Sequence, residues 1–178
     1  LLEILNELRV RKHQATDMQH IGKMPTGIVQ THPGTRHIIA VDLSLSRLYL
    51  LERDGETTQF SVAEQHYVSI GRGGIGKVDE GDLKTPVGIY RIDSFRADEK
   101  LPELYGSGAF TLDFPNELDR LDNFEGHGIW LHGVPHSQIN RPPLTSEGCV
   151  VMRNDLVEHL LDTIDRGSTP VILADSLQ

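Results

Sequence analysis

Short apolar runs, each ended by a glycine, a proline or a small polar turn, dominate the sequence from residue 37 to its end. The runs have the length of strands and are rich in Ile, Val, Leu and Tyr. Asp54-Gly55, between two of them, is a typical hairpin turn. The predicted strands are His37–Asp42, Arg47–Leu51, Gln59–Ala63, His66–Ile70, Val87–Asp93, Ala109–Phe114, Gly128–Gly133, Val150–Met152 and Thr169–Leu173.

A single segment of this part of the chain has the spacing of a helix. Leu156, Val157, Leu160, Leu161 and Ile164 recur at intervals of three and four residues and predict one buried helical face over Leu156–Ile164. Asn154-Asp155, just before them, offers an N-cap. The sequence therefore predicts a mostly β fold with one helix close to its C-terminal end.

The first 35 residues differ from this pattern. Leu1–Val10 has an apolar helical stripe and is too acidic for a signal peptide, so we expect a helix with a packing or dimer face. Because the chain begins with Leu1 and not Met, we expect a trimmed or processed product. His20–Arg36 is rich in glycine and proline, as linkers are. The predicted division is a helix and linker over 1–35 and a main domain over 36–178.

Composition excludes several classes of function. The chain of 178 residues has 26 acidic and 17 basic residues, and a net charge of -9 disfavours a nucleic-acid binder. Its one cysteine, Cys149, excludes an internal disulfide and any multi-cysteine zinc module. No run approaches the roughly 18 apolar residues of a membrane span, so no span is predicted in this sequence.

Gly71–Lys77 (GRGGIGK) matches the spacing of a phosphate-binding loop. The next residue is Val78, where such a loop needs a Ser or Thr hydroxyl for magnesium. Carboxylates at 79, 80 and 82 follow in place of an apolar helix, and they would repel a nucleotide. We therefore predict a loop that leaves a strand, and no nucleotide site.

A second motif lies between Ile129 and Asn154. A predicted strand ends in His132-Gly133, and the chain returns through Ser146-Glu147-Gly148 to Cys149. A cysteine thiol is mostly protonated at neutral pH, and a neighbouring imidazole can take its proton. The backbone around Gly148 and Cys149 can direct amide N–H groups at a developing oxyanion. The Gly133 carbonyl could accept from the other imidazole nitrogen and fix its tautomer, which would give a Cys-His-carbonyl triad.

These residues resemble the catalytic domain of the L,D-transpeptidases (YkuD-like). The family pattern is a strand ending in His-Gly, a loop, and then Ser-x-Gly-Cys, which here are His132-Gly133 and Ser146–Cys149. Gly81–Tyr90 (GDLKTPVGIY) also resembles the Thr-Pro-x-Gly strand entry of the family. The resemblance runs from about residue 36 to 173 and implies a β-sandwich-like catalytic domain.

The resemblance implies an enzyme of peptidoglycan chemistry, in the periplasm or at the cell wall, with a part in wall biogenesis and cell shape. Cys149 would attack the bond from an L-centre to a D-residue in a stem tetrapeptide and release D-alanine. His132 would be general base and then general acid. The acyl group would pass to a diaminopimelate or lipoprotein amine, or to water. The family needs no metal or organic cofactor, and carbapenems are expected to acylate the thiol.

Two positions depart from the usual family pattern. Glu147 stands where many members have His, and Val151 stands where they have Arg or Asn, so another residue must bind the substrate carboxylate. Arg141 and Arg153 are the candidates. Ser146 is expected first as a turn residue and second as a substrate contact.

Three functions stay open at this point. The Gly-Cys-apolar-apolar ending is similar to the L,D-carboxypeptidase branch, where water is the acceptor, so transpeptidase and carboxypeptidase are equally supported. The loss of the family Arg also allows a non-catalytic module that binds peptidoglycan stems.

Two other features of the motif region are not expected to carry chemistry. Trp130 is predicted to pack in the core, between Ile129 and Leu131 of the same strand. A zinc site of His127, His132, His136 and Cys149 is disfavoured, because Pro135 rules out a helical His-x-x-x-His face.

Overall fold

The structure is a computed structural model that describes residues 31–177. The predicted N-terminal helix with its dimer face, and the linker up to residue 30, lie outside the described residues. The domain boundary at residues 35 and 36 stays a prediction.

Strands make up most of the regular secondary structure of the described residues. The elements are β1 (His37–Asp42), β2 (Arg47–Arg53), β3 (Phe60–Tyr67), β4 (Ile70–Gly71), β5 (Gly74–Ile75), β6 (Lys84–Thr85), β7 (Gly88–Ala97), η2 (Asp98–Lys100), η3 (Glu103–Tyr105), β8 (Gly108–Leu112), α2 (Glu117–Leu121), β9 (Trp130–His132), β10 (Leu144–Ser146), β11 (Val150–Val151), α3 (Asn154–Thr163) and β12 (Pro170–Ala174). The mostly β class is therefore confirmed, as is the helix that follows the cysteine.

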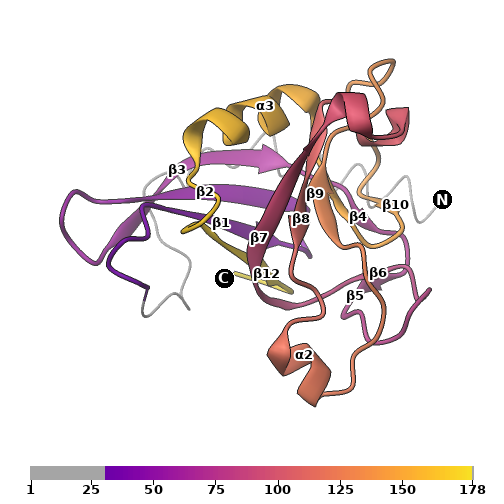
Figure 1. The fold of residues 1–178 in the computed structure, drawn as a ribbon, viewed down its shortest axis with the longest axis horizontal. Helices are drawn as coiled ribbons and strands as arrows, with labels where there is room; N and C mark the ends of the chain where they lie inside the picture. The colour runs from indigo at the N-terminus through magenta and orange to yellow at the C-terminus, as the bar shows by residue number, and fades with distance from the viewer. Residues whose placement is uncertain (1–30, 178) are drawn as a thin grey trace.

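Eight strands form one curled sheet in the order β11-β9-β8-β7-β12-β1-β2-β3 (Figure 1). β1, β2 and β3 follow one another as antiparallel neighbours, whereas β1 pairs with β12, and β9 with β11, in parallel. The pairs β4–β10 and β5–β6 form two small separate parallel sheets. The curled sheet therefore carries the His-Gly strand and the cysteine strand together at one edge.

The main core lies between the sheet and α3, which crosses one face of it (Figure 1). Leu156, Val157 and Leu160 of α3 are buried there against side chains of the sheet. Each fully buried side chain of this kind stabilises the fold by about 1.5–3 kcal/mol. The helical stripe read from the sequence is thus the surface that fixes α3 on the sheet.

β1 is buried on both of its faces. Ile39 and Val41 point into the main core, and Ile38 and Ala40 point into a second apolar cluster with side chains of β2 and β3. Strands covered on both sides are continuously apolar in sequence. This explains why the run Ile-Ile-Ala-Val shows no alternation.

The prediction of two strands over Gln59–Ala63 and His66–Ile70 is wrong. One continuous strand, β3, covers Phe60–Tyr67, and the short β4 follows it. The polar residues between the two predicted runs stay in the ladder, where Glu64 pairs with Leu50, and a bulge beside Leu50 absorbs the change of register. A polar edge strand keeps its backbone pairing even where its side chains lose the apolar pattern.

The N-cap expected at Asn154-Asp155 is also wrong. Arg153 is the N-cap residue of α3, without a side-chain cap, and Asn154 is already helical. The Asn154 side chain instead accepts hydrogen bonds from the backbone N–H groups of Ser107 and Val134, each at 3.1 Å. An asparagine at a helix start here serves two distant loops.

An ion pair between Lys77 and Asp82 closes the loop that begins with Gly71–Lys77, the segment with the spacing of a phosphate-binding loop. β5 and β6 pair in parallel, and the buried Lys77 ammonium donates to Asp82 at 2.9 Å and to the Asp79 carbonyl at 2.9 Å. Asp82 also accepts from the backbone N–H groups of Val78, Asp79 and Lys84. The lysine that a nucleotide site would need is therefore committed to a carboxylate of its own loop.

We predict that Asp82 ties the stability of the fold to acid pH. Burial raises the pKa of Asp82, but the Lys77 and backbone hydrogen bonds outweigh it and lower that pKa from 3.8 to about 2. A depressed pKa contributes stability above pH 4 that is lost as pH falls from about 4 to about 2, here about 2 kcal/mol. Asp82→Asn should lose about this much at pH 7 in urea unfolding and show a flatter loss in acid.

Asp79→Asn is the matched control, because Asp79 lies in the same turn and its side chain is exposed. Its unfolding free energy at pH 7 should stay within about 0.5 kcal/mol of that of the unsubstituted protein. Equal effects of the two substitutions would contradict the assignment to Asp82.

Candidate active site

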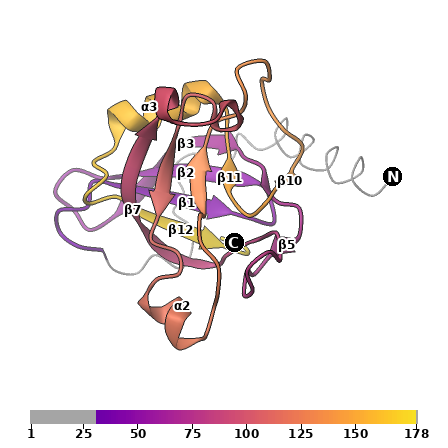
Figure 2. The same ribbon diagram turned by 45° about the vertical axis from the view of Figure 1, so that its right-hand side comes forward.

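The parallel pairing of β9 with β11 brings the two halves of the cysteine motif together (Figure 2). Leu131 pairs with Val150, and His132 pairs with Val151. Paired residues in a sheet point to the same face and alternate along the strand. Because Leu131 and Val150 point into the main core, His132 lies on the opposite, outer face, and the same register carried back one residue puts Cys149 beside Trp130 on that face.

His132 is held in one orientation by its neighbour. Its Nδ1 lies 2.7 Å from the Gly133 carbonyl oxygen, which can only accept, so Nδ1 carries the proton and Nε2 keeps a lone pair. The residue is 3% exposed. Burial lowers the pKa of His132 to about 4, against a raising effect of the Gly133 carbonyl and a further lowering by the Arg141 charge. The imidazole is therefore neutral at physiological pH.

The thiol of Cys149 is half-buried and protonated. Its Sγ donates to the Gly128 carbonyl at 3.3 Å, and the backbone N–H of Trp130 donates to the sulfur. Burial raises the pKa of Cys149 to about 11, the Trp130 N–H lowers it, and the Glu147 carboxylate raises it. Thiol and imidazole are thus both neutral in the resting protein.

The Ser146–Cys149 turn is built by its own serine. Ser146 Oγ donates to the Cys149 carbonyl at 2.6 Å and accepts from the Gly148 N–H at 3.1 Å. Thr85, of the strand-entry motif, donates to the Gly148 carbonyl at 2.9 Å. Gly148 has a φ of 126°, and an added Cβ would lie 2.8 Å from the Lys84 carbonyl, so only glycine fits. These contacts fix the backbone that presents the thiol.

Gly133 is required by a contact across the motif. A Cβ at this position would collide with Oδ1 of Asn154, the atom that binds the N–H groups of Ser107 and Val134. The Gly133 N–H also donates to the Tyr105 carbonyl at 3.0 Å. The carbonyl that accepts from His132 is therefore held by bonds on both sides.

Tyr105 is a site residue that the sequence analysis missed. Its ring packs edge-on against His132, with centroids 4.9 Å apart, and lies 5.0 Å from Trp130. Burial and the nearby Cys149 raise the pKa of Tyr105. Tyr105 ends η3, a single turn far from the motif in sequence, and no pattern of residues marks it.

The three predicted substrate residues lie in different surroundings. The Arg141 charge acts on His132, and the Arg141 carbonyl accepts from Tyr67 at 2.7 Å. Arg153 makes a two-pronged pair with Asp155 at 2.9 and 2.6 Å on the exposed surface. The Ser146 hydroxyl is engaged within its turn. Of the two arginines, Arg141 is the one whose charge lowers the pKa of His132.

Trp130 is not a core residue, contrary to the prediction. It lies half-buried on the outer face, where its ring contacts Tyr105 and the guanidinium of Arg96, whose Cζ is 4.8 Å from the ring centroid. Its strand neighbours Ile129 and Leu131 are the buried ones. Alternation along β9 sends Trp130 to the same side as His132.

The candidates for a zinc site face other partners. His127 lies 3.5 Å from Glu80, and His136 lies 3.6 Å from Asp98 and 3.4 Å from Glu103. Over residues 31–177 no group of three or more His, Cys, Asp or Glu side chains has an arrangement suited to a metal ion. In the same range, no helix has the length and apolar character to cross a membrane.

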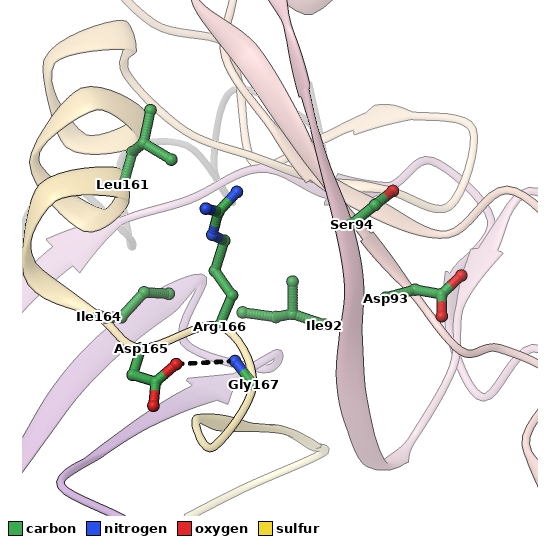
Figure 3. A pocket seen from close by; sticks show the side chains of 8 residues that line it. All are labelled: Ile92, Asp93, Ser94, Leu161, Ile164, Asp165, Arg166 and Gly167. Carbon is green, nitrogen blue, oxygen red and sulfur yellow. Dashed lines mark hydrogen bonds between the residues drawn. The ribbon is translucent and has the colours of Figure 1, made fainter.

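An open pocket of about 410 Å³ lies away from the thiol, between β7 and the segment that joins α3 to β12 (Figure 3). Apolar side chains form part of its wall, with Asp93 and Arg166 at polar positions. Its lining residues are Ile92, Asp93, Ser94, Leu161, Ile164, Asp165, Arg166 and Gly167. No residue of the cysteine motif is among them.

Residues 36–173 match the family model described as the L,D-transpeptidase catalytic domain, YkuD. The chain belongs to this family. The match covers every strand of the L,D-transpeptidase sheet except the last residue of β12. It includes both halves of the cysteine motif.

Solved structures have the same fold. Bd1075 of Bdellovibrio bacteriovorus is 35% identical, with a TM-score of 0.68 over 88% of this chain and 52% of its own. Pgp2 of Campylobacter jejuni, a helical cell shape determining protein, is 20% identical, with a TM-score of 0.70 over 98% of this chain and 56% of its own.

The curated relative YafK of Escherichia coli K12 is 26% identical over 107 residues, which are 60% of this chain and 39% of YafK. The chain thus spans about half of the length of these proteins or less.

We predict that Gly133 and Asn154 are energetically coupled. Gly133→Ala should lower the free energy of unfolding by about 1–3 kcal/mol through overpacking against Oδ1. Asn154→Ala should cost a similar amount, about 1–3 kcal/mol, because two N–H groups lose their acceptor. The double variant should lose clearly less than the sum in urea unfolding, because the shorter side chain makes room for the new Cβ.

Gly167→Ala is the control, since its Cβ would meet only ordinary contacts. It should leave stability within about 0.5 kcal/mol of the unsubstituted protein. Strictly additive losses at 133 and 154 would contradict the proposed collision.

Proposed function

We propose that this chain is the catalytic domain of a cysteine L,D-transpeptidase that modifies peptidoglycan outside the cytoplasm, in the periplasm or at the cell wall. Its substrate is a stem tetrapeptide, and Cys149 is the nucleophile. The observation that carries the proposal is the neutral His132, with Nδ1 bound to the Gly133 carbonyl, on the face of the sheet that also bears Cys149. Membership of the family supports the same reaction.

In the acylation step, Nε2 of His132 takes the thiol proton as Sγ of Cys149 attacks the carbonyl carbon of the L-centre. The carbon–sulfur bond forms and the carbonyl electrons move to oxygen. When the intermediate collapses, the bond to the D-alanine nitrogen breaks, and the imidazolium returns the proton to the leaving amine. The products are D-alanine and a thioester on Cys149.

The second step returns the enzyme to its resting state. An acceptor amine loses a proton to Nε2 and attacks the thioester carbon, and the Cys149 sulfur leaves and regains the proton. A diaminopimelate amine gives a cross-link and a lipoprotein lysine gives an anchor. Both steps use only the side chains and backbone of this chain, and a carbapenem carbonyl should acylate the same sulfur.

The backbone at the thiol is the proposed oxyanion site. The Cys149 N–H is the first donor we assign to the developing charge. The Gly148 N–H donates to Ser146 Oγ at rest, so it would have to exchange this bond to become the second donor. Arg141 is the proposed substrate contact on the side of His132, with Ser146 and Arg153 as lesser candidates.

L,D-carboxypeptidase is the second candidate, and the surroundings of Val151 favour it. Val151 is 1% exposed in β11, so this position offers no polar group to an acceptor or donor carboxylate. With water in place of the amine, the same thioester would give a tripeptide. A wall-trimming reaction of this kind would act on cell shape through the stems available for cross-links.

We predict that the purified protein removes D-alanine from a disaccharide-tetrapeptide, as followed by mass spectrometry. Cys149→Ala should remove all turnover, and His132→Gln should lower kcat by about 10²–10⁴-fold, the usual contribution of a general base. Dimers linked through two diaminopimelate residues would show transpeptidation, and tripeptide alone would show carboxypeptidase activity.

Binding of the tetrapeptide by both the unsubstituted protein and Cys149→Ala, with no product from either, would contradict the enzymatic proposal. It would leave the peptidoglycan-binding module as the function.

We also predict that the thiol reacts slowly with iodoacetamide at neutral pH. With the pKa of Cys149 raised to about 11, the thiolate fraction at pH 7 is about a hundredfold below that of an ordinary cysteine. The rate should rise about tenfold per pH unit between pH 7 and 10. Cys149 is the single cysteine, so mass spectrometry of the intact protein reports it alone. A rate that levels off near pH 7 would indicate a thiolate–imidazolium pair instead.

A further inference from the structure

We propose that Arg96, held over Trp130, is the carboxylate-binding residue of the substrate site, in place of the polar residue that the family usually has at position 151. The inference rests on the proposed function and specifies the chemistry that the site recognises: a free carboxylate of the stem peptide.

The register of the sheet puts Arg96 on the same outer face of the sheet as His132. Arg96 of β7 pairs with Ala109 of β8, which pairs with His132 of β9, which pairs with Val151 of β11. Residues in such a row point to the same side of the sheet. The Arg96 side chain therefore starts two strands, about 10 Å, from His132 on the outer face.

A small residue between the two leaves space for the arginine. Ala109 occupies β8 in this row, so the Arg96 side chain can cross it toward β9. There its Cζ lies 4.8 Å from the centroid of the Trp130 ring. The backbone N–H of the same Trp130 donates to the sulfur of Cys149. One residue thus contacts the guanidinium with its ring and the nucleophile with its main chain.

Arg96, Trp130, Tyr105 and His132 form a continuous stack. Successive members are 4.8, 5.0 and 4.9 Å apart, measured from Cζ and between ring centroids. The Arg96 charge and Cys149 both affect the pKa of Tyr105, in opposite directions. The guanidinium and the thiol therefore lie near the same phenol ring, which agrees with the register argument.

The Arg96 guanidinium is exposed, and in the described part of the chain no carboxylate lies within ion-pair distance of it. Arg72, Arg91 and Arg153 differ in this respect, because they pair with Glu147, Asp113 and Asp155 respectively. A guanidinium stacked on an aromatic face keeps its N–H groups free at the edge, where they suit a carboxylate in two-pronged fashion. Arg96 is a cation placed for an external anion.

Two carboxylates of the stem tetrapeptide belong to the residues on either side of the bond that Cys149 would attack. One is at the terminal D-alanine, and the other is on the side chain of diaminopimelate. The shared chemistry is a planar anion about one or two strand spacings, 5–10 Å, from the thiol. Amidation of either group removes its charge and separates the two sources.

The test measures binding apart from turnover. Calorimetry in the Cys149→Ala background would compare the tetrapeptide with its two amidated forms, and Arg96→Gln would be added to the same background. We expect Arg96→Gln to weaken binding of the tetrapeptide about 10- to 100-fold. One amidated form should bind the Arg96 protein equally weakly, and the substitution should have no effect on that form.

Two further variants make the result specific. Arg91→Gln, on the same strand, should leave binding unchanged, because Arg91 is paired with Asp113. Arg96→Lys should restore binding only in part, because lysine keeps the charge and loses the planar fork. In the active enzyme, Arg96→Gln should raise KM and leave kcat within about threefold, as expected when an interaction common to ground and transition states is lost.

The proposal is overturned if Arg96→Gln binds the tetrapeptide as tightly as its parent, or if it still discriminates the acid from both amides. Absence of measurable tetrapeptide binding in the parent also overturns it. If the tetrapeptide binds tightly and its binding depends on Arg96, but the unsubstituted protein makes no product, the proposed reaction is contradicted. The carboxylate subsite at Arg96 then still stands.

Discussion

The parallel contact between β9 and β11 is the interaction on which the candidate site depends. Both strands are short, and they are secured by bonds beyond their own pairing. The Met152 N–H donates to the His132 carbonyl at 2.9 Å, and Ser69 and Val151 exchange two backbone hydrogen bonds of 2.8 Å. Leu131 and Val150 anchor the pair in the main core. Since the core fixes one face of these strands, it also fixes which residues face outward.

Burial and hydrogen bonding together set the electrostatic state of that outer face. The same low exposure that holds His132 in place lowers its pKa to about 4, and burial with the Glu147 charge raises the pKa of Cys149 to about 11. Neutral groups carry little desolvation cost, so the site can be closed without a buried ion pair. In the proposed reaction, charges form only when the thiol proton moves to the imidazole, whose Nδ1 is already bound to the Gly133 carbonyl.

The sequence predicted most strands of the curled sheet, α3 and the cysteine motif, because these depend on local patterns: apolar runs, helical spacing, and glycines beside His132 and Cys149. It did not predict the short strands β5, β6 and β10, and it divided β3 from β4 at the wrong place. It missed what depends on register. Trp130 was assigned to the core because apolar neighbours flank it, whereas alternation along β9 turns it outward. Tyr105 lacks any motif and reaches the site only because η3 folds against Gly133. Asn154 looked like a helix cap, and its contacts with two loops could be seen only in three dimensions.

Glu147 connects the Gly71–Lys77 loop, which is not a nucleotide site, with the cysteine turn. Glu147 replaces the usual histidine of the family, and its carboxylate by itself opposes a thiolate at Cys149. Arg72, from the Gly71–Lys77 loop, lies 3.1 Å from Glu147, and its backbone N–H donates to the Ser146 carbonyl at 2.8 Å. Both side chains are exposed, so water and salt weaken the pair. The glycine-rich loop therefore contributes a partial counter-charge and a backbone support to the cysteine turn, which gives its arginine a role without a phosphate ligand.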